Sequence, residues 1–554
     1  MSGTSRIPTL IEVDPQTSRR GLPSQLAADL GGHNILQRTL QRVQAATRIE
    51  APLLICRKEH EAAVRELLGD MPAQIFTHSL PQPSHQNAIR RSRKWGKEGW
   101  RGGLLDSYFV SEQGNSRAIG AALAQHGWRS VLLLPAAAPF LDPAILDEIA
   151  GHCLDGMEAK ELYLSTAPPG IGGDVLSGAA AAIVAENEAP LDALVRVEPD
   201  NPLADPERWA HHFPEEITGF RGRFTVDSAN DLALARALWQ LHGGAVPCRQ
   251  LFDTLRANPE LVAGVVPEEL ILELGADAGG VVAPRTGFAT GALDDAVFGR
   301  VLEALGQRDD ALLTLGGGYH DPLLDPRLEE RIAAARAAGA FGIHIATPGA
   351  LLTPERAAAL LATGPDVVTV DTMAPVQEQL APQTPPLAQR EGGLEALLAA
   401  RGTLEDPPLV LVSMILDERS ALHFDRYFDR WYGRVDRVLF RGADGPCGEQ
   451  LPSSMGVFAP PHRTACGRLN AQLRVEANGC VPLCDRDPLH SMSCGDLRVS
   501  SVAEVWQGGA LRNARAAHRD RQWQQHGHCG ACTSWFRFDG VAAPASDVGV
   551  PAAR

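Results

Sequence analysis

Four cysteines near the C-terminal end have a spacing that suits metal binding. Cys466 is followed by twelve residues, then Gly479, four further residues and Cys484, and the pair Cys529 and Cys532 lies downstream. A two-residue spacer lets both sulfurs of a pair reach one metal site, and four thiolates suit zinc or an iron–sulfur cluster. Gly479 predicts a tight turn with a positive φ between the strands that carry these ligands.

Two more cysteines and two histidines lie close to this set. Cys480 and Cys494 are either spare ligands or bystanders, and His526 and His528 flank Cys529. The histidines could join a zinc site or could simply be exposed. Thiols stay reduced in the cytoplasm, so clustered cysteines in a cytoplasmic chain indicate metal rather than disulfides.

Composition narrows the classes of function. Lysine and arginine number 51 against 67 aspartates and glutamates, so the net charge is 51 − 67 = −16, which argues against a general nucleic-acid binder. The hydrophobic content of 44% is that of a globular protein. The N-terminus has no apolar run typical of a secretory signal, and no stretch is long and apolar enough to span a membrane. We therefore expect a cytoplasmic protein.

The elements that must position these residues fall into regions. In residues 1–245, candidate strands alternate with helices such as 36–46 and 143–150, which predicts an α/β domain with a largely parallel sheet. The candidate strands are 8–13, 52–56, 130–134, 161–164 and 181–184.

Residues 246–460 repeat a strand and then a helix more regularly, which predicts a partial (β/α)6 barrel of the TIM type. The candidate strands are 270–274, 311–315, 341–346, 366–371, 409–415 and 437–440, with helices at 325–338 and 353–363. Residues 461–540 have a poor apolar core that a bound metal would stabilise. The tail, 541–554, is expected to be disordered.

The cysteine-rich region resembles a SPASM domain, the iron–sulfur module of many radical S-adenosylmethionine enzymes. The resemblance rests on Cys466, the strand 473–475, Gly479, Cys484, the segments 495–497 and 501–506, Arg515, and the closing cysteine pair. It implies one four-iron four-sulfur cluster, with zinc as the alternative metal. The implied ligands are Cys466, Cys484, Cys529 and Cys532.

The preceding barrel region resembles the radical S-adenosylmethionine barrel. Residues 318–324 resemble the glycine-rich motif after the second strand, and Thr347 stands at the end of the third. The resemblance implies cofactor-binding roles for Gly318, Asp321 and Thr347, although Asp321 could instead cap a following helix. The family carries three cysteines just after the first strand, but residues 274–284 contain none. Cleavage of S-adenosylmethionine is therefore not expected.

The first region resembles sugar-activating nucleotidyltransferases, notably the cytidylyltransferases, which have a glycosyltransferase-A or Rossmann-like fold. The resemblance rests on 21–25 with 30–43, on 131–142, and on 223–227 with 231–232. Gln25 stands where the family has a lysine, and Ala137 stands where it has a metal-binding aspartate. Arg19 and Arg20 could partly replace the lysine, and Asp227 would be the retained acid or a turn-forming residue.

A basic segment, 90–101, adds six cations and two tryptophans to this acidic chain. Such a loop could hold phosphate or an acidic glycan through Arg93, Lys94 and Arg101, with an indole ring stacked on a sugar or base. A solvated loop pinned by its tryptophans is the alternative.

This order of domains resembles the spiro-SPASM proteins. We expect an iron–sulfur protein with disabled radical and nucleotidyltransferase sites, acting in the modification of cell-surface sugars or peptides. One alternative is an active nucleotidyl- or glycosyltransferase that uses the Arg-rich loop, and another is a zinc-stapled scaffold. Expected partners are a small molecule or nucleotide sugar, or a peptide or protein.

Overall fold

The computed structural model describes residues 6–83, 85–95, 115–156, 162–165, 167–187, 210–211, 213–218, 220, 222–275, 291–316, 320–372, 386–416, 420–442, 463–485, 487, 492–532 and 535. Gly318, Arg101 and the tail 541–554 lie outside these residues. The chain forms two compact units, Met1–Ala257 and Asn258–Arg554. Among the described residues, no helix is both long enough and apolar enough to cross a bilayer.

The first unit is built on a seven-stranded sheet in the order β3-β2-β1-β4-β6-β5-β7. Strands β1 to β4 are parallel, and β6 runs antiparallel to its neighbours β4 and β5. The strands are β1 Thr9–Glu12, β2 Leu53–Arg57, β3 Gln74–His78, β4 Ser130–Pro135, β5 Leu162–Ser165, β6 Asp174–Ser177 and β7 Ala210–His211. The helices are α1 Ile35–Gln44, α2 Glu61–Leu68 after the short η1 Lys58–His60, α3 Gln86–Lys94, α4 Ser116–His126, α5 Pro143–Gly156, α6 Gly178–Glu186, α7 Glu215–Thr218, α8 Ala229–His242 and α9 Cys248–Ala257.

The prediction of a strand at 181–184 is wrong. These residues lie in α6, whose first turn is capped by the Ser177 hydroxyl, an acceptor for the Ala180 N–H. Alanine is the strongest helix former, so the run of alanines favours a helix once this cap is in place. β6, which comes just before the helix, pairs with β4 instead.

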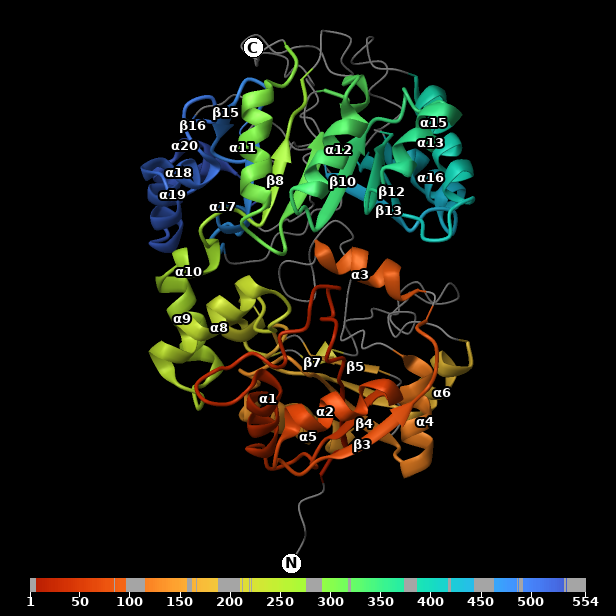
Figure 1. Ribbon diagram of the computed structural model, residues 1–554, viewed down its shortest axis with the longest axis vertical. Helices are drawn as coiled ribbons and strands as arrows, with labels where there is room; N and C mark the ends of the chain where they lie inside the picture. Colours follow the sequence, from red (N-terminus) through yellow and green to blue (C-terminus); the bar gives the residue numbers. More distant parts are fainter. Residues whose placement is uncertain are drawn as a thin grey trace, which may run out of the picture. The chain divides into compact units, whose positions relative to one another are not determined.

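The second unit contains a seven-stranded sheet that is parallel throughout, in the order β13-β12-β11-β10-β9-β8-β14 (Figure 1). The strands are β8 Glu269–Leu272, β9 Leu312–Gly316, β10 Gly342–Thr347, β11 Val367–Asp371, β12 Leu409–Leu416, β13 Arg437–Gly442 and β14 Gln472–Val475. The helices before β14 are α10 Glu260–Ala263, α11 Asp295–Leu305, η4 Pro322–Leu324, α12 Leu328–Ala337, α13 Pro354–Ala362, α15 Leu387–Arg401, η5 Ser420–His423, α16 Phe424–Trp431 and α17 Arg468–Ala471.

The cysteine-rich segment is part of this second unit. Its strand β14 pairs with β8 and forms one edge of the seven-stranded parallel sheet. The rest is a two-stranded antiparallel sheet, β15 Cys480–Pro482 with β16 Ser493–Asp496, followed by α18 Val502–Trp506, α19 Gly509–Arg519, η7 Trp523–Gln525 and α20 Gly527–Ala531. One apolar core contains side chains from the helices and strands of this unit, α18 included.

Candidate functional site

The first unit has an open pocket with a cavity volume of about 130 Å³ at the carboxyl ends of its parallel strands. In parallel α/β sheets ligands bind at this edge, because the loops that follow the strands converge there. Glu12 ends β1, Arg57 ends β2, His78 ends β3, and Ala136 and Ala137 follow β4, and all five line the pocket.

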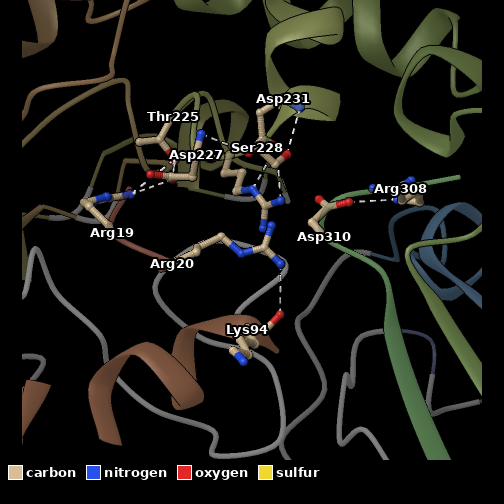
Figure 2. Close-up of polar contacts among 10 residues, drawn as sticks. Arg19, Arg20, Lys94, Thr225, Asp227, Ser228, Asp231, Arg308 and Asp310 are labelled. Atoms are coloured by element: carbon tan, nitrogen blue, oxygen red, sulfur yellow. Dashed lines mark hydrogen bonds and ion pairs between the residues drawn. The ribbon is translucent and has the colours of Figure 1, made fainter. Parts of the chain in front are cut away.

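Arg19 and Asp227 form an ion pair on the pocket wall. The Arg19 guanidinium lies 3.4 Å from the Asp227 carboxylate and donates to the Thr225 hydroxyl at 3.2 Å (Figure 2). Thr225 in turn donates to Asp227 at 2.7 Å. Burial alone would raise the pKa of the Asp227 carboxyl, but Arg19, the Thr225 hydroxyl and two further arginines outweigh it and lower the pKa. Asp227 is therefore ionised at neutral pH.

The basic segment is a helix where the structure describes it. Residues 90–94, which the sequence predicted to be a loop, lie in α3, and so the cations are held on a rigid element. Arg90 and Arg93 line the pocket, whereas Lys94 takes part through its carbonyl, which accepts from Arg20 at 3.1 Å. Arg20 is only 3% exposed and positions the end of α3, and it does not line the pocket.

The two positions at which the nucleotidyltransferase pattern fails both lie on this pocket. Gln25 and Ala137 are among its lining residues. A neutral amide therefore occupies the position expected for a lysine, and a methyl group that expected for a metal-binding carboxylate. The loop around Gln25 keeps its shape through backbone hydrogen bonds from Ser24 to Gln16 and from Ala28 to Gln25.

The pocket also contains acids that the sequence reasoning missed. Glu12 and Asp14 line it beside His60, which is 7% exposed and lies 3.7 Å from Asp14. Burial raises the pKa of the Glu12 carboxyl to about 7. An acid at the end of an apolar strand such as 9–12 is the signal that could have found it.

In the second unit, the four predicted cysteine ligands come from different elements. Cys466 precedes α17, Cys484 follows β15, and Cys529 and Cys532 lie in and just after α20. Burial raises the pKa of the thiols at 466, 484 and 529, that of Cys529 to about 12, and the thiols at 466, 529 and 532 each raise the pKa of others in the set. The four side chains therefore lie within electrostatic reach of one another.

Buried polar groups hold the backbone around these cysteines. The His518 ring accepts from the Cys466 N–H at 3.1 Å, and burial lowers the pKa of His518 to about 4, so this ring is neutral. The Arg463 guanidinium donates to the Cys529 carbonyl at 2.6 Å. His528 is buried, with 9% of its surface exposed, and is not one of the surface histidines that the sequence allowed. Its Nε2 lies 3.6 Å from the Cys484 sulfur.

Gly479 has a φ of 85°, which confirms the turn predicted between the ligand-bearing strands. A Cβ there would lie 3.0 Å from side-chain atoms of Arg498 and Val297. We expect Gly479→Ala to lower the free energy of unfolding by about 1–3 kcal/mol, because the left-handed conformation and the close contacts both oppose a side chain. Urea unfolding checks this against Gly402→Ala, at a helix end with a φ of −62°. Equal losses in both variants would show that the turn imposes no such constraint.

At the carboxyl edge of the parallel sheet of the second unit, the Thr347 hydroxyl donates to the Asp321 carboxylate at 2.8 Å. Asp321 also caps η4 by accepting from the Leu323 N–H, which confirms the capping alternative. The carboxyl is 2% exposed, and burial raises its pKa to about 6. Next to it, His320 lies 3.6 Å from Glu273, which also pairs with Arg474 on β14.

Residues 466–533 match the family model of the SPASM domain, described as an iron–sulfur cluster-binding domain. This segment is a SPASM domain. An uncharacterized protein of Treponema pallidum (strain Nichols) is 25% identical over 116 residues, which cover 20% of this chain and 30% of the relative. The match thus spans less than a third of that relative's length.

Two solved structures show weak similarity. A cytidylyltransferase from Leptospira borgpetersenii serovar Hardjo-bovis (strain JB197) has 14% identity and a TM-score of 0.35, covering 46% of this chain and 96% of its own. SuiB of Streptococcus suis, bound to S-adenosylmethionine, has 9% identity and a TM-score of 0.36, covering 48% of this chain and 71% of its own. At these scores the similarities decide neither fold nor chemistry.

Proposed function

We propose that this chain is an iron–sulfur protein whose N-terminal pocket binds a phosphate-bearing ligand of the nucleotide or nucleotide-sugar class without transferring it. The cluster would be a single four-iron four-sulfur cluster on Cys466, Cys484, Cys529 and Cys532. One observation carries the proposal: all four cysteines lie in the segment 466–533, which matches an iron–sulfur cluster-binding domain. The proposal also includes a role in the modification of sugars or peptides. Its domain limits are 1–245, 246–460 and 461–540.

The match of this segment to an iron–sulfur cluster-binding domain favours a cluster over zinc. A single zinc ion needs four sulfurs about 2.3 Å from one point. Among the described residues, no three His, Cys, Asp or Glu side chains are arranged to hold one metal ion. In a four-iron cluster each thiolate binds its own iron, so the sulfurs lie farther apart. When bound, the cluster supplies electron transfer or structural stability.

The chain's own residues prepare the thiols for metal. Without metal, burial and mutual repulsion keep the thiols protonated, so metal binding must release protons. The neutral His518 fixes the backbone at Cys466, and Arg463 fixes the carbonyl of Cys529. The Asp487 carboxylate lies 3.6 Å from His528 and orients that ring beside Cys484.

Metal analysis of protein purified without oxygen tests the cluster. About four irons and four sulfides per chain, with a broad absorption band near ~400 nm, are expected. One zinc per chain without iron would overturn the cluster and leave the zinc-stapled scaffold.

The pocket favours binding over transfer. Nucleotidyl transfer requires a divalent ion to neutralise developing phosphate charge. Asp227 is already neutralised by Arg19, and Ala137 offers no second carboxylate. A phosphate can still be held by Arg90 and Arg93. The absence of cysteines from residues 274–284 supports a barrel that does not cleave S-adenosylmethionine.

We expect cytidine 5′-monophosphate to bind the full-length protein and the double variant Arg90→Gln/Arg93→Gln to bind it at least about tenfold more weakly, because two charge-assisted hydrogen bonds are lost. Calorimetric titration measures this, and Arg249→Gln, on an exposed part of α9, is the control. Unchanged binding in the double variant would refute the assigned site. Magnesium-dependent release of pyrophosphate from cytidine triphosphate would instead favour the active transferase.

A further inference from the structure

Glu12 lines the pocket, where Arg90 and Arg93 of α3 act on its charge. It is the last residue of β1, where it lies between Ile55 of β2 and Pro135 of β4. One carboxylate oxygen accepts a long hydrogen bond of 3.4 Å from the Asn115 N–H. No cation within the described part of the chain lies within ion-pair distance of Glu12.

Arg90, on the α3 wall of the same pocket, is in a similar position. Its Nε is buried and has no hydrogen-bond partner, and burial lowers the pKa of the guanidinium. Arg93 beside it donates to the Arg19 carbonyl at 3.3 Å. Charge in a partly desolvated site is costly, and a ligand or a proton that binds here lowers that cost.

We propose that Glu12 is a ligand-binding residue of this pocket, which takes up a proton from solvent when a phosphate-bearing ligand binds and donates that proton in a hydrogen bond to the ligand. The proposal rests on the proposed function, in which Arg90 and Arg93 hold the phosphate. It adds a residue that the cytidylyltransferase resemblance does not supply. No covalent bond is made or broken; one proton moves from solvent to the Glu12 carboxylate.

Electrostatics give the direction in which protonation of Glu12 changes the affinity for the anion. Burial is the largest cause and raises the pKa of Glu12, Asp14 also raises it, and Asn115, Arg93 and Arg90 lower it, which together leave the pKa at about 7. A bound anion neutralises the two arginines and adds its own negative charge, so the pKa of Glu12 must rise on binding. Above pH 7 the ionised carboxylate repels the anion, so affinity must fall as the pH rises through 7.

Other charged groups face Glu12 from the elements around it, and the histidines among them also favour anion binding at low pH. They are Asp14 after β1, Arg19 in the following loop, Arg57 and His60 at the end of β2, His78 at the end of β3, Arg90 and Arg93 on α3, and Asp227 on the opposite wall. The test must therefore separate Glu12 from His60 and His78.

Sulfate is the probe, because its charge does not change between pH 6 and 8.5. In calorimetric titrations of the full-length protein, we expect its affinity to fall about tenfold over this range, as a pKa rise of about one unit on binding implies. Glu12→Gln, which keeps size and can donate, should bind sulfate with a nearly flat profile. Glu66→Gln, which removes the same charge from the exposed face of α2, should keep the slope.

Parallel titrations in two buffers of different ionisation enthalpy should show proton uptake near pH 7 in the natural protein and little in Glu12→Gln. An equal slope and equal uptake in both proteins would overturn the role of Glu12 and assign the pH dependence to the histidines. Failure of both sulfate and cytidine 5′-monophosphate to bind any of these proteins would instead overturn the proposed ligand class. Matching thermal melts of the variants establish that the fold is retained.

Discussion

Replacing Cys484 with serine is expected to remove nearly all iron and sulfide from the protein. Burial, Asp485 and the thiols of the other three proposed ligands all raise the pKa of Cys484, so those thiols lie near it. A serine hydroxyl is a poor ligand for iron, and a cluster that lacks one of its four ligands loses its iron and sulfide readily. Because metal binding contributes folding energy, the thermal stability of the second unit should fall with it.

Two matched variants make this result specific to the proposed ligands. Cys480→Ser changes a cysteine on the neighbouring strand β15, and Cys153→Ser changes a buried cysteine in the first unit. Both should keep about four irons per chain, measured by chemical analysis and absorption. Iron loss in Cys480→Ser equal to that in Cys484→Ser would contradict the set of four and make Cys480 a ligand.

Trp506→Ala is expected to destabilise the second unit by about 3–5 kcal/mol, as for other large buried aromatic residues. Trp506 is fully buried, and its indole N–H donates to the Ala263 carbonyl at 3.0 Å. The Arg515 guanidinium lies 4.0 Å from the centre of its ring, and burial lowers the pKa of Arg515 to about 10. Truncation would leave a cavity, an unpaired carbonyl and a cation without its aromatic neighbour.

Hydrogen exchange of the second unit measures this loss without requiring the whole chain to unfold in one step. Trp506→Phe keeps most of the packing but lacks the N–H, so it should lose only about 1–3 kcal/mol. Trp128→Ala, which removes a half-buried tryptophan in the first unit, should leave exchange in the second unit unchanged. A loss below about 1 kcal/mol in Trp506→Ala would show that α18 does not anchor the cysteine-rich segment.

Sequence alone predicts most strands of both sheets because parallel strands are buried on both faces. Such strands are uninterrupted apolar runs, as in Leu53–Arg57 and Leu409–Leu416, and turn residues separate them from helices. β3, Gln74–His78, escapes this reasoning because it is a half-exposed edge strand of mixed composition. The apolar run at 181–184 was wrongly predicted to be a strand, because the capping serine and several alanines stabilise a helix there.

The candidate sites are only partly predictable. The resemblance to cytidylyltransferases pointed to Arg19 and Asp227 and the basic segment pointed to Arg93, and all three line one pocket. Its place at the end of an apolar strand marks Glu12 as a candidate, but its surroundings come from far along the chain; its hydrogen-bond donor, Asn115, is 103 residues away. The same holds for His528, which contacts Cys484, 44 residues away.

The pairing of β14 with β8 has a consequence for how the protein is made. Gln472 and Glu269 are partners in this pairing and are 203 residues apart in the chain. A nascent chain therefore carries an unpaired β8 edge until β14 has been translated, and such edges are sites of aggregation.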